Sequence, residues 1–174
     1  GIAKGGNSSF ATVWSVQTSI GSLGIIWYGN DAQKEKWLPG LCTGEKIAAF
    51  ALTEPAAGSD AANIQTTADI DGEDFILNGS KIFCTNGDRA DLTIVFATND
   101  KNLGPMGGIT AFLVEKNTPG FSVGKIEKKM GLKASSTAEL IFENCKIPKS
   151  NVLGDVGAGF MVALTTLDGG RISL

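Results

Sequence analysis

The sequence predicts an α+β protein with a middle domain built as an antiparallel β-barrel or β-sandwich and flanked by helical segments. Apolar residues with helical spacing occupy the chain up to about residue 44 and return after residue 159. Between them, short apolar runs alternate with Gly, Pro and Asn at intervals typical of all-β barrels and sandwiches. This change in periodicity divides the chain into three zones.

The helical zones are predicted from capping residues and apolar spacing. Serines at residues 8–9 precede an apolar pattern over residues 10–27, which predicts one helix. Asn30 or Asp31 is suited to begin a second helix. Near the other end, a helical pattern over residues 160–167 follows two glycines. We therefore expect helices on both sides of the β zone.

The β zone contains a series of short apolar runs bounded by turn residues. We expect strands at residues 48–52, 66–70, 75–77, 81–85, 92–97, 109–114, 121–126 and 138–142. Asp71-Gly72 and Asn78-Gly79 are expected to be hairpin turns, because both dipeptides favour type I′ turns.

The charge balance argues against a nucleic-acid partner, and the length of the apolar runs argues against a membrane span. Lys and Arg number 15 and Asp and Glu 18, for a net charge of −3, whereas a nucleic-acid partner requires a basic surface. We interpret the lysines of residues 125–129 as a solvated strand end. No apolar run approaches the roughly twenty residues of a membrane-spanning helix. We therefore expect neither nucleic-acid binding nor a membrane span.

Cysteine and histidine usage limits the possible chemistry. The three cysteines show no C-x-x-C spacing, which predicts a reducing compartment and small buried side chains. The chain has no histidine, the commonest metal ligand and general base. We therefore expect no metal site, and any acid or base chemistry must come from a carboxylate.

A strand joined directly to a Gly-Ser loop is the first candidate site. The apolar run at residues 48–52 leads into residues 53–60, Thr-Glu-Pro-Ala-Ala-Gly-Ser-Asp. Gly58 permits a tight backbone path, and Ser59 offers a hydroxyl and an N–H to a phosphate oxygen. By itself, this pattern fits either a cofactor loop or an ordinary turn.

A second segment, Asn-Gly-Ser-Lys-Ile-Phe-Cys-Thr-Asn-Gly at residues 78–87, indicates a family when it is taken with the first. The chain resembles the acyl-CoA dehydrogenases, flavoenzymes that convert an acyl-CoA thioester into a trans-2-enoyl-CoA. Residues 53–60 match the family's TEP-x-AGSD loop, and residues 78–87 match its NG-x-K-x-x-x-TNG strand. Further matches lie at residues 118–120, 130–135, 147–154 and 167–171, so the resemblance extends over essentially the whole chain.

The resemblance also implies how the chain is organised. Family members are longer, with a helical domain before this region and a helical bundle after it. We therefore expect a central fragment in three parts. These are the end of the N-terminal helical domain at residues 1–45, a flavin-binding β middle domain at residues 46–155, and the truncated start of the C-terminal helical domain at residues 156–174.

FAD is the cofactor that the resemblance implies. Phe50, Leu52 and Thr53 would offer backbone groups and one hydroxyl to the pyrimidine edge of the flavin. Phe83 would pack against the ring, and Thr85 would lie near the hydride-accepting N5. The implied cofactor residues are Phe50, Ala51, Leu52, Thr53, Gly58, Ser59, Phe83, Cys84 and Thr85. The alternative is that Phe50, Leu52 and Phe83 are simply core residues.

The resemblance places the substrate, an acyl-CoA, at Ser59, Asp168 and Arg171. Ser59 would meet the flavin pyrophosphate and also touch the acyl-CoA. Asp168 and Arg171 are three residues apart, so on a helix they share a face, and in the family they line the acyl-CoA cleft. The alternative is that they form a surface ion pair.

No catalytic residue is assigned within the 174 residues. Glu54 and Asp60 are interpreted as carboxylates that fix a loop through hydrogen bonds. In the family the base is a glutamate from elsewhere, which a minority of members place just before the arginine that Arg171 matches. That position is Gly170 here, so we expect the fragment alone to be inactive.

The implied reaction is short-chain acyl-CoA dehydrogenation. The complete enzyme would remove a proton from Cα and a hydride from Cβ, and pass electrons to an electron-transfer flavoprotein. Residues 167–172 most resemble short-chain (butyryl-CoA) or short-branched-chain members. A homotetramer is implied, cytoplasmic in a bacterium and in the mitochondrial matrix in a eukaryote. The alternatives are an acyl-CoA oxidase of the same fold and a non-catalytic β domain used for binding or assembly.

Overall fold

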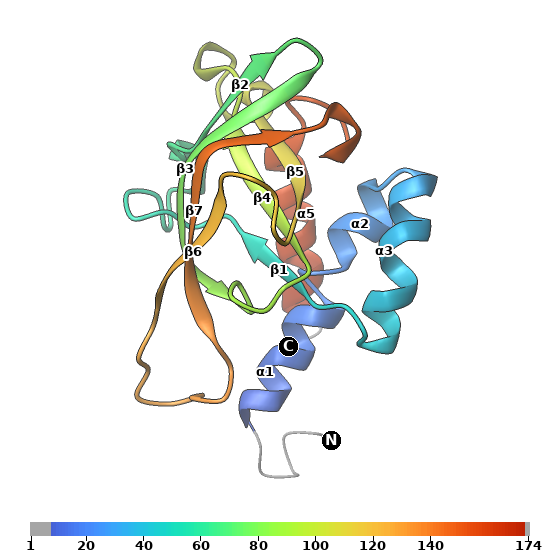
Figure 1. Cartoon of the computed structure of the whole chain (residues 1–174), viewed down its shortest axis with the longest axis vertical. Coiled ribbons are helices and arrows are strands. Elements are labelled where there is room, and N and C mark those ends of the chain that lie inside the picture. Colours follow the sequence, from blue (N-terminus) through green and yellow to red (C-terminus); the bar gives the residue numbers. More distant parts are fainter. Residues whose placement is uncertain (1–7, 173–174) are drawn as a thin grey trace.

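The computed structural model describes residues 8–172 and has helices in both zones where the sequence predicts them, with one further short helix inside the β zone (Figure 1). The helices are α1 (Ser8–Thr18), α2 (Leu23–Tyr28), α3 (Asp31–Thr43), the single turn α4 (Pro105–Gly108) and α5 (Gly159–Ile172). Asn30 begins α3 with a capping box, in which its side chain accepts from the N–H of Gln33 and its own N–H donates to the Gln33 side chain.

The single helix expected over residues 10–27 is wrong, because the chain turns between α1 and α2. The hydroxyl of Ser22 donates to the carbonyl of Gln17 at 2.5 Å, and the N–H of Gly21 donates to the carbonyl of Val16 at 2.8 Å. Serine side chains that bond to nearby carbonyls compete with helical hydrogen bonds, which the apolar pattern alone does not reveal.

One mostly antiparallel sheet follows the first helices. Its strands in the described residues are β1 (Ala48–Ala51), β2 (Thr67–Asp71), β3 (Asp74–Thr85), β4 (Leu92–Thr98), β5 (Ile109–Glu115), β6 (Phe121–Ile126), β7 (Thr137–Ile147) and β8 (Val152–Leu153). They are ordered β6-β7-β3-β2-β4-β5-β8, with β1 paired to β4. The α+β class is confirmed. The sheet is not closed into a barrel, however, and β1 and β2 run parallel to β4.

The hairpin turn expected at Asn78-Gly79 is also wrong. Strand β3 continues through this dipeptide, with a register shift against β7 between Leu77 and Gly79. Gly79 has φ of +144°, and a Cβ there would lie 2.7 Å from Oγ1 of Thr66. The glycine therefore marks a bulge where another segment approaches closely, not a turn.

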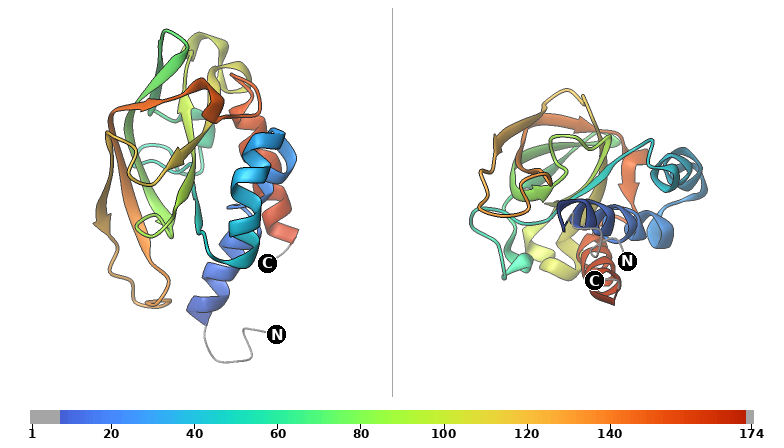
Figure 2. Two further views of the ribbon diagram at one scale, coloured as in Figure 1. Left: turned by 45° about the vertical axis from the view of Figure 1, so that its right-hand side comes forward. Right: turned by 90° about the horizontal axis from the view of Figure 1, so that it is seen from below.

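Two apolar clusters hold the sheet from its two faces. The first includes Ile25 and Trp37 of the helices together with Ile94 of β4. The second includes Val95 of β4 and Leu140 of β7. Strand β4 is buried along its whole length, because α2, α3 and α5 cover one face while β3 and β7 curl over the other (Figures 1 and 2).

Helix α5 packs closely on the sheet at its first residue. A Cβ at Gly159 would lie 2.5 Å from the carbonyl carbon of Thr110, so α5 begins in direct contact with the backbone of β5. Near its other end, a Cβ at Gly169 would lie 2.3 Å from the ring of Trp27 on α2. The small residues in α5 therefore serve close packing, and they place the second half of the helix beside α2.

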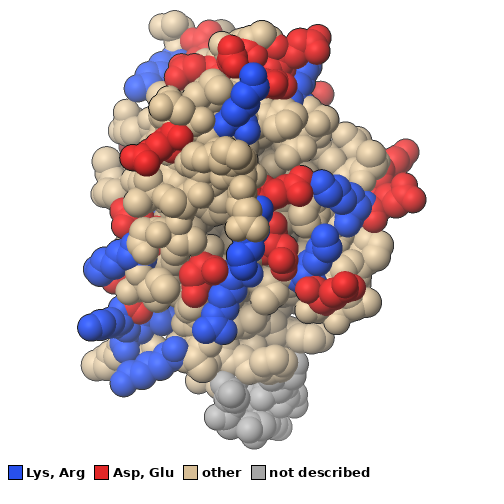
Figure 3. Space-filling model, in the orientation of Figure 1, with Lys and Arg blue, Asp and Glu red and all other residues tan. Residues whose placement is uncertain are grey.

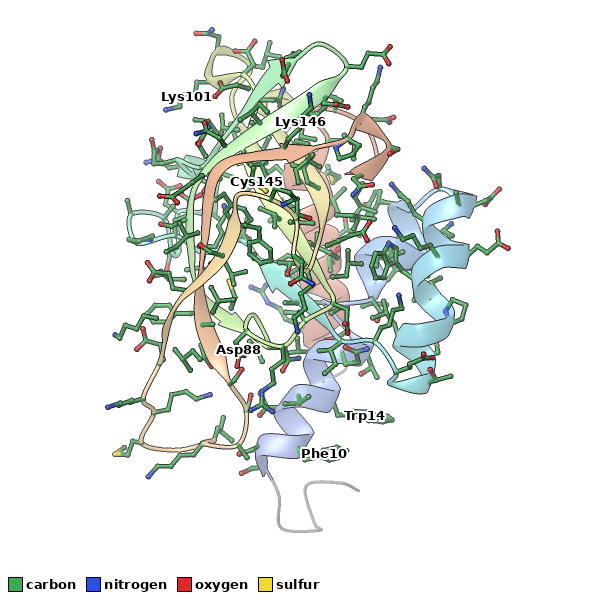
Figure 4. The ribbon with its side chains drawn as sticks, viewed as in Figure 1. Phe10, Trp14, Asp88, Lys101, Cys145 and Lys146 are labelled. Atoms are coloured by element: carbon green, nitrogen blue, oxygen red, sulfur yellow. The ribbon has the colours of Figure 1, made fainter. Side chains whose placement is uncertain are left out.

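The surface carries both signs of charge. Lys and Arg side chains and Asp and Glu side chains are interspersed on the face shown in Figure 3. Phe10 and Trp14 of α1 are half exposed and project from that helix away from the sheet (Figure 4). Across residues 8–172, no helix combines the length and apolar character needed to cross a membrane.

Candidate functional site

A cavity of about 390 Å³ collects most of the predicted cofactor residues in one place. Its lining includes seven of the nine: Phe50, Leu52, Thr53, Gly58, Ser59, Phe83 and Thr85. The cavity lies where the end of β1, the loop after it and the end of β3 meet α1 and α5. Segments separated by more than a hundred residues in the sequence therefore form one site.

The floor of the cavity is also part of the hydrophobic core. Phe50 and Leu52 are 9% and 8% exposed, and the Phe50 ring lies 4.9 Å from that of Phe96. Both residues belong to the apolar cluster beneath the helices and both line the cavity. For these two residues the core and the cofactor interpretations are compatible, because one side chain supports the sheet and borders the cavity.

Phe83 does not belong to the core. Its side chain is 61% exposed and lines the cavity, and its φ of +57° lies in the left-handed region that large side chains rarely adopt. The register of β3 against β7 shifts between Lys81 and Cys84, and this irregularity turns Phe83 outward. Unfavourable backbone conformations of this kind cluster at functional sites. The core alternative is therefore wrong for Phe83.

Ala51 and Cys84 are the two predicted cofactor residues whose side chains face away from the cavity. They are 0% and 2% exposed and pack in the second apolar cluster. Burial raises the pKa of the Cys84 thiol to about 12, although the nearby ammonium of Lys81 opposes this. The thiol therefore stays protonated and unreactive near neutral pH. Only backbone atoms of these two residues are available for a ligand.

Three hydroxyls at the cavity are free to bind a ligand. Thr53 and Thr85 are half buried and Ser59 is exposed, and all three line the cavity. Within residues 8–172, their hydroxyl groups have no protein hydrogen-bond partner. Such groups suit a ligand with several polar atoms.

Glu54 fixes the loop, as predicted. Its Oε1 accepts from Nζ of Lys81 and Oγ1 of Thr66, both at 2.6 Å, and its Oε2 accepts from the N–H of Gln65 at 2.5 Å. Burial alone would raise the pKa of Glu54, but the Lys81 ammonium and these hydrogen bonds hold it below the ordinary 4.5. The carboxylate is thus ionised and fully occupied, which excludes it as a base at the cavity.

Sequence reasoning missed Lys81, the partner of Glu54. Its side chain is 0% exposed, although lysine is almost never fully buried unless it is paired. Burial lowers the pKa of Lys81 below its ordinary 10.5, and the Glu54 carboxylate opposes that shift. The signal available in the sequence was a lysine beside the apolar residues 82–84 of a predicted strand, together with acidic residues in the candidate loop.

Arg171 and Asp168 lie on the exposed side of α5. Their charged groups are 3.6 Å apart, and each side chain is 76% exposed. Arg171 lines the cavity, whereas Asp168 lies outside it. A long ion pair in solvent contributes little to stability, so the surface-pair alternative describes Asp168 better than Arg171. Gly170, between them, is buried, and a Cβ there would lie 2.8 Å from Cγ2 of Ile20.

Comparison with known proteins matches two segments of the chain to domains of one family. The acyl-CoA dehydrogenase middle-domain model matches residues 49–145, and the N-terminal-domain model matches residues 2–45. A short-chain specific acyl-CoA dehydrogenase of Megasphaera elsdenii is 55% identical over 86% of this chain and 39% of its own length.

Two solved structures are also similar to this chain. Butyryl-CoA dehydrogenase from Megasphaera elsdenii is 49% identical with a TM-score of 0.93, over 96% of this chain and 44% of that one. A chain from the structural study of the electron transferring flavoprotein of Acidaminococcus fermentans is 50% identical with a TM-score of 0.93, at the same coverage. The 174 residues thus span less than half the length of these relatives.

Proposed function

This chain belongs to the acyl-CoA dehydrogenase family, and from that premise we propose that it holds the FAD of an enzyme that oxidises a short-chain acyl-CoA to a trans-2-enoyl-CoA. The observation that carries the proposal is the gathering of seven predicted cofactor residues around one cavity. The proposed parts are residues 1–45 as the end of the N-terminal domain, 46–155 as the middle domain and 156–174 as the start of the C-terminal domain.

The residues around the cavity fit a flavin. The unpartnered hydroxyls of Thr53 and Thr85 would donate to polar atoms at the edge of its ring system, and the outward-facing ring of Phe83 would pack against its flat face. Ser59 on the glycine loop would donate to the pyrophosphate. When bound, FAD supplies the hydride acceptor of the reaction. Donors aimed at a ring that gains negative charge on reduction would favour electron uptake.

The substrate would bind on the side of the cavity formed by helices. Val16 and Ile20 of the α1 region and Leu164 and Leu167 of α5 give this side an apolar surface suited to a short acyl chain. Ser59 and Arg171 would contact the polar part of the thioester. Asp168 would act there only at the rim, since it lies outside the cavity.

The base that removes the α-proton would come from outside residues 8–172. None of the described residues that line the cavity is an aspartate or a glutamate, and the buried Glu54 carboxylate forms an ion pair with Lys81. We propose an electron-transfer flavoprotein as the electron acceptor and a homotetramer as the assembly. The similarity to a chain from an electron transferring flavoprotein study supports the first of these. Relatives occur in bacteria and in mitochondria, which supports the bacterial cytoplasm or the mitochondrial matrix.

The test is flavin bleaching in the complete protein. We expect anaerobic addition of butyryl-CoA to the FAD-loaded protein to abolish the visible absorbance of oxidised flavin. Unchanged absorbance would contradict the proposal and favour a non-catalytic binding domain. Fast reoxidation of the reduced flavin by dioxygen would identify an oxidase instead of a dehydrogenase.

Arg171→Lys should raise the KM for butyryl-CoA by roughly tenfold, about 1.4 kcal/mol, with little change in FAD content or Tm. Lysine keeps the charge but lacks the planar fork of donors that arginine offers to the polar groups of the thioester. The matched control is Arg89→Lys, because Arg89 is also exposed and also lies 3.6 Å from an aspartate, Asp88, but does not line the cavity. An unchanged KM in Arg171→Lys, or loss of FAD, would show that Arg171 is not a substrate residue.

A further inference from the structure

The ion pair between Lys81 and Glu54 is buried next to the cavity without lining it. The two side chains are 0% and 4% exposed, and Nζ lies 2.6 Å from Oε1. Burying two charges costs desolvation that their attraction often fails to repay, so well-packed apolar residues are commonly at least as stabilising. Stability alone is therefore a poor explanation for this pair.

The pair joins the two segments that carry the proposed flavin contacts. Nζ of Lys81 on β3 also donates to the carbonyl of Leu52 at 3.3 Å, so one ammonium holds both the end of the β1 segment and the loop. The N–H of Ile82 donates to the carbonyl of Thr53 at 2.8 Å beside it. These bonds fix residues 52–54, which include Thr53, against residues 81–82, which directly precede Phe83.

Strand β3 needs such an anchor, because it is irregular on both sides of Lys81. Its register against β7 shifts between Leu77 and Gly79 and again between Lys81 and Cys84. Only residues 79–81 are in register between these shifts. A slip of one residue in a strand moves its side chains to the opposite face. The buried ammonium of Lys81, bonded to Glu54 and Leu52, lies at the last in-register residue before the second shift, ahead of Phe83 and Thr85.

Thr66 ties a third segment to the same carboxylate. Its hydroxyl and its N–H both donate to Oε1 of Glu54, at 2.6 and 3.0 Å. This approach requires Gly79, since any Cβ at that position would overlap Thr66. The bulge at Gly79 thus makes room for Thr66, and Thr66 and Lys81 bind the same Glu54 carboxylate.

We propose that the Lys81–Glu54 pair is a positioning device that fixes Phe83 and Thr85 of β3 against Thr53 of the loop, and thereby sets the affinity for FAD and its reduction potential. This inference rests on the proposed function. The two residues touch no part of the cavity themselves and act through their neighbours. An apolar pair of similar volume at these two positions would fill the space, but it would supply neither the bond between them nor the bond to the Leu52 carbonyl.

The double variant Lys81→Met/Glu54→Gln in the complete protein tests the proposal, because it removes both charges at nearly constant volume. We expect the Tm of the apo-protein to change by only a few degrees. The Kd for FAD should rise at least about tenfold, and the flavin reduction potential should fall. Lys146→Met/Asp71→Asn is the matched control. It removes an ion pair of the same sheet that is 2.9 Å long and about half exposed. Lys146 is labelled in Figure 4. The control should change none of the three quantities.

The outcomes separate the two proposals. If the wild-type protein binds no FAD, the proposed function fails. If the wild type binds FAD and the double variant matches it in Kd and potential, the positioning role is overturned. A fall in apo-protein Tm with unchanged flavin properties would assign the pair to stability alone. Should the double variant not fold, Glu54→Asp decides, since it keeps both charges but shortens the side chain that reaches Lys81: a lowered potential supports the role, and an unchanged one overturns it.

Discussion

Lys81→Met is expected to lower the free energy of unfolding at pH 7 by about 3–5 kcal/mol, the usual cost of removing one partner from a buried ion pair. The substitution leaves the Glu54 carboxylate 4% exposed and without its cation. The remaining donors, from Gln65 and Thr66, do not neutralise the charge. The loss should exceed that in the double variant with Glu54→Gln, in which no charge is left unpaired.

The loss of unfolding free energy in Lys81→Met should grow as pH rises. In the wild type, the pKa of Glu54 lies below its ordinary 4.5, so its contribution to stability is present above about pH 4.5 and is lost as pH falls through the lower folded pKa. In Lys81→Met, burial remains while the ammonium is gone, so the pKa should rise above 4.5. The variant should then be relatively most stable below pH 4.5 and lose stability as pH rises through the raised pKa.

Urea unfolding over a series of pH values measures both effects. The difference in free energy between wild type and Lys81→Met should be largest near pH 7 and should shrink toward pH 4. Lys146→Met is the control, because Lys146 is 54% exposed and pairs with Asp71 in solvent, where ion pairs contribute little. Equal losses in both variants, or a difference independent of pH, would show that Glu54 does not carry an uncompensated charge.

The sequence predicts the elements well where local chemistry determines them. The helix start at Asn30 or Asp31 and the alternation or apolar runs of the strands are local features, and they appear in the structure at nearly the expected positions. The failures lie where a distant contact decides the backbone. Asn78-Gly79 favours a hairpin locally, but the approach of Thr66 uses the glycine in a bulge instead.

Most of the residues that line the cavity were predictable from the sequence, but their arrangement was not. Motif resemblance selects residues 50–53, 58–59 and 83–85, and the cavity gathers most of them. Regular strand alternation would place Phe83 on the same face as Lys81. The structure instead turns Phe83 outward and Cys84 inward, because the register shift reverses the pattern. The irregularity follows Lys81, which pairs with Glu54 at 2.6 Å, twenty-seven residues away in the sequence, so no local pattern could reveal this environment.

The 174-residue chain by itself should show no dehydrogenase activity, even when it is supplied with FAD and an artificial electron acceptor. Removal of the α-proton requires a positioned base, which typically accelerates such a step by about 10² to 10⁴. The described lining of the cavity offers Arg171 and three hydroxyls, but no carboxylate. The chain has no histidine, Glu54 is bound to Lys81, and the Cys84 thiol is buried and protonated. None of the described residues that line the cavity offers a carboxylate or an imidazole to accept the proton.

Turnover of butyryl-CoA, followed by reduction of the acceptor, measures this directly. The control is chemical reduction of the flavin on the same sample, which shows that any bound FAD can accept electrons. Flavin that is reduced chemically but not by butyryl-CoA would locate the defect in proton removal and not in cofactor binding. Turnover above the rate without protein would contradict the prediction. It would require a base within residues 1–174, and the carboxylate of Asp60, exposed at the end of the loop after Ser59, would then be the first to examine.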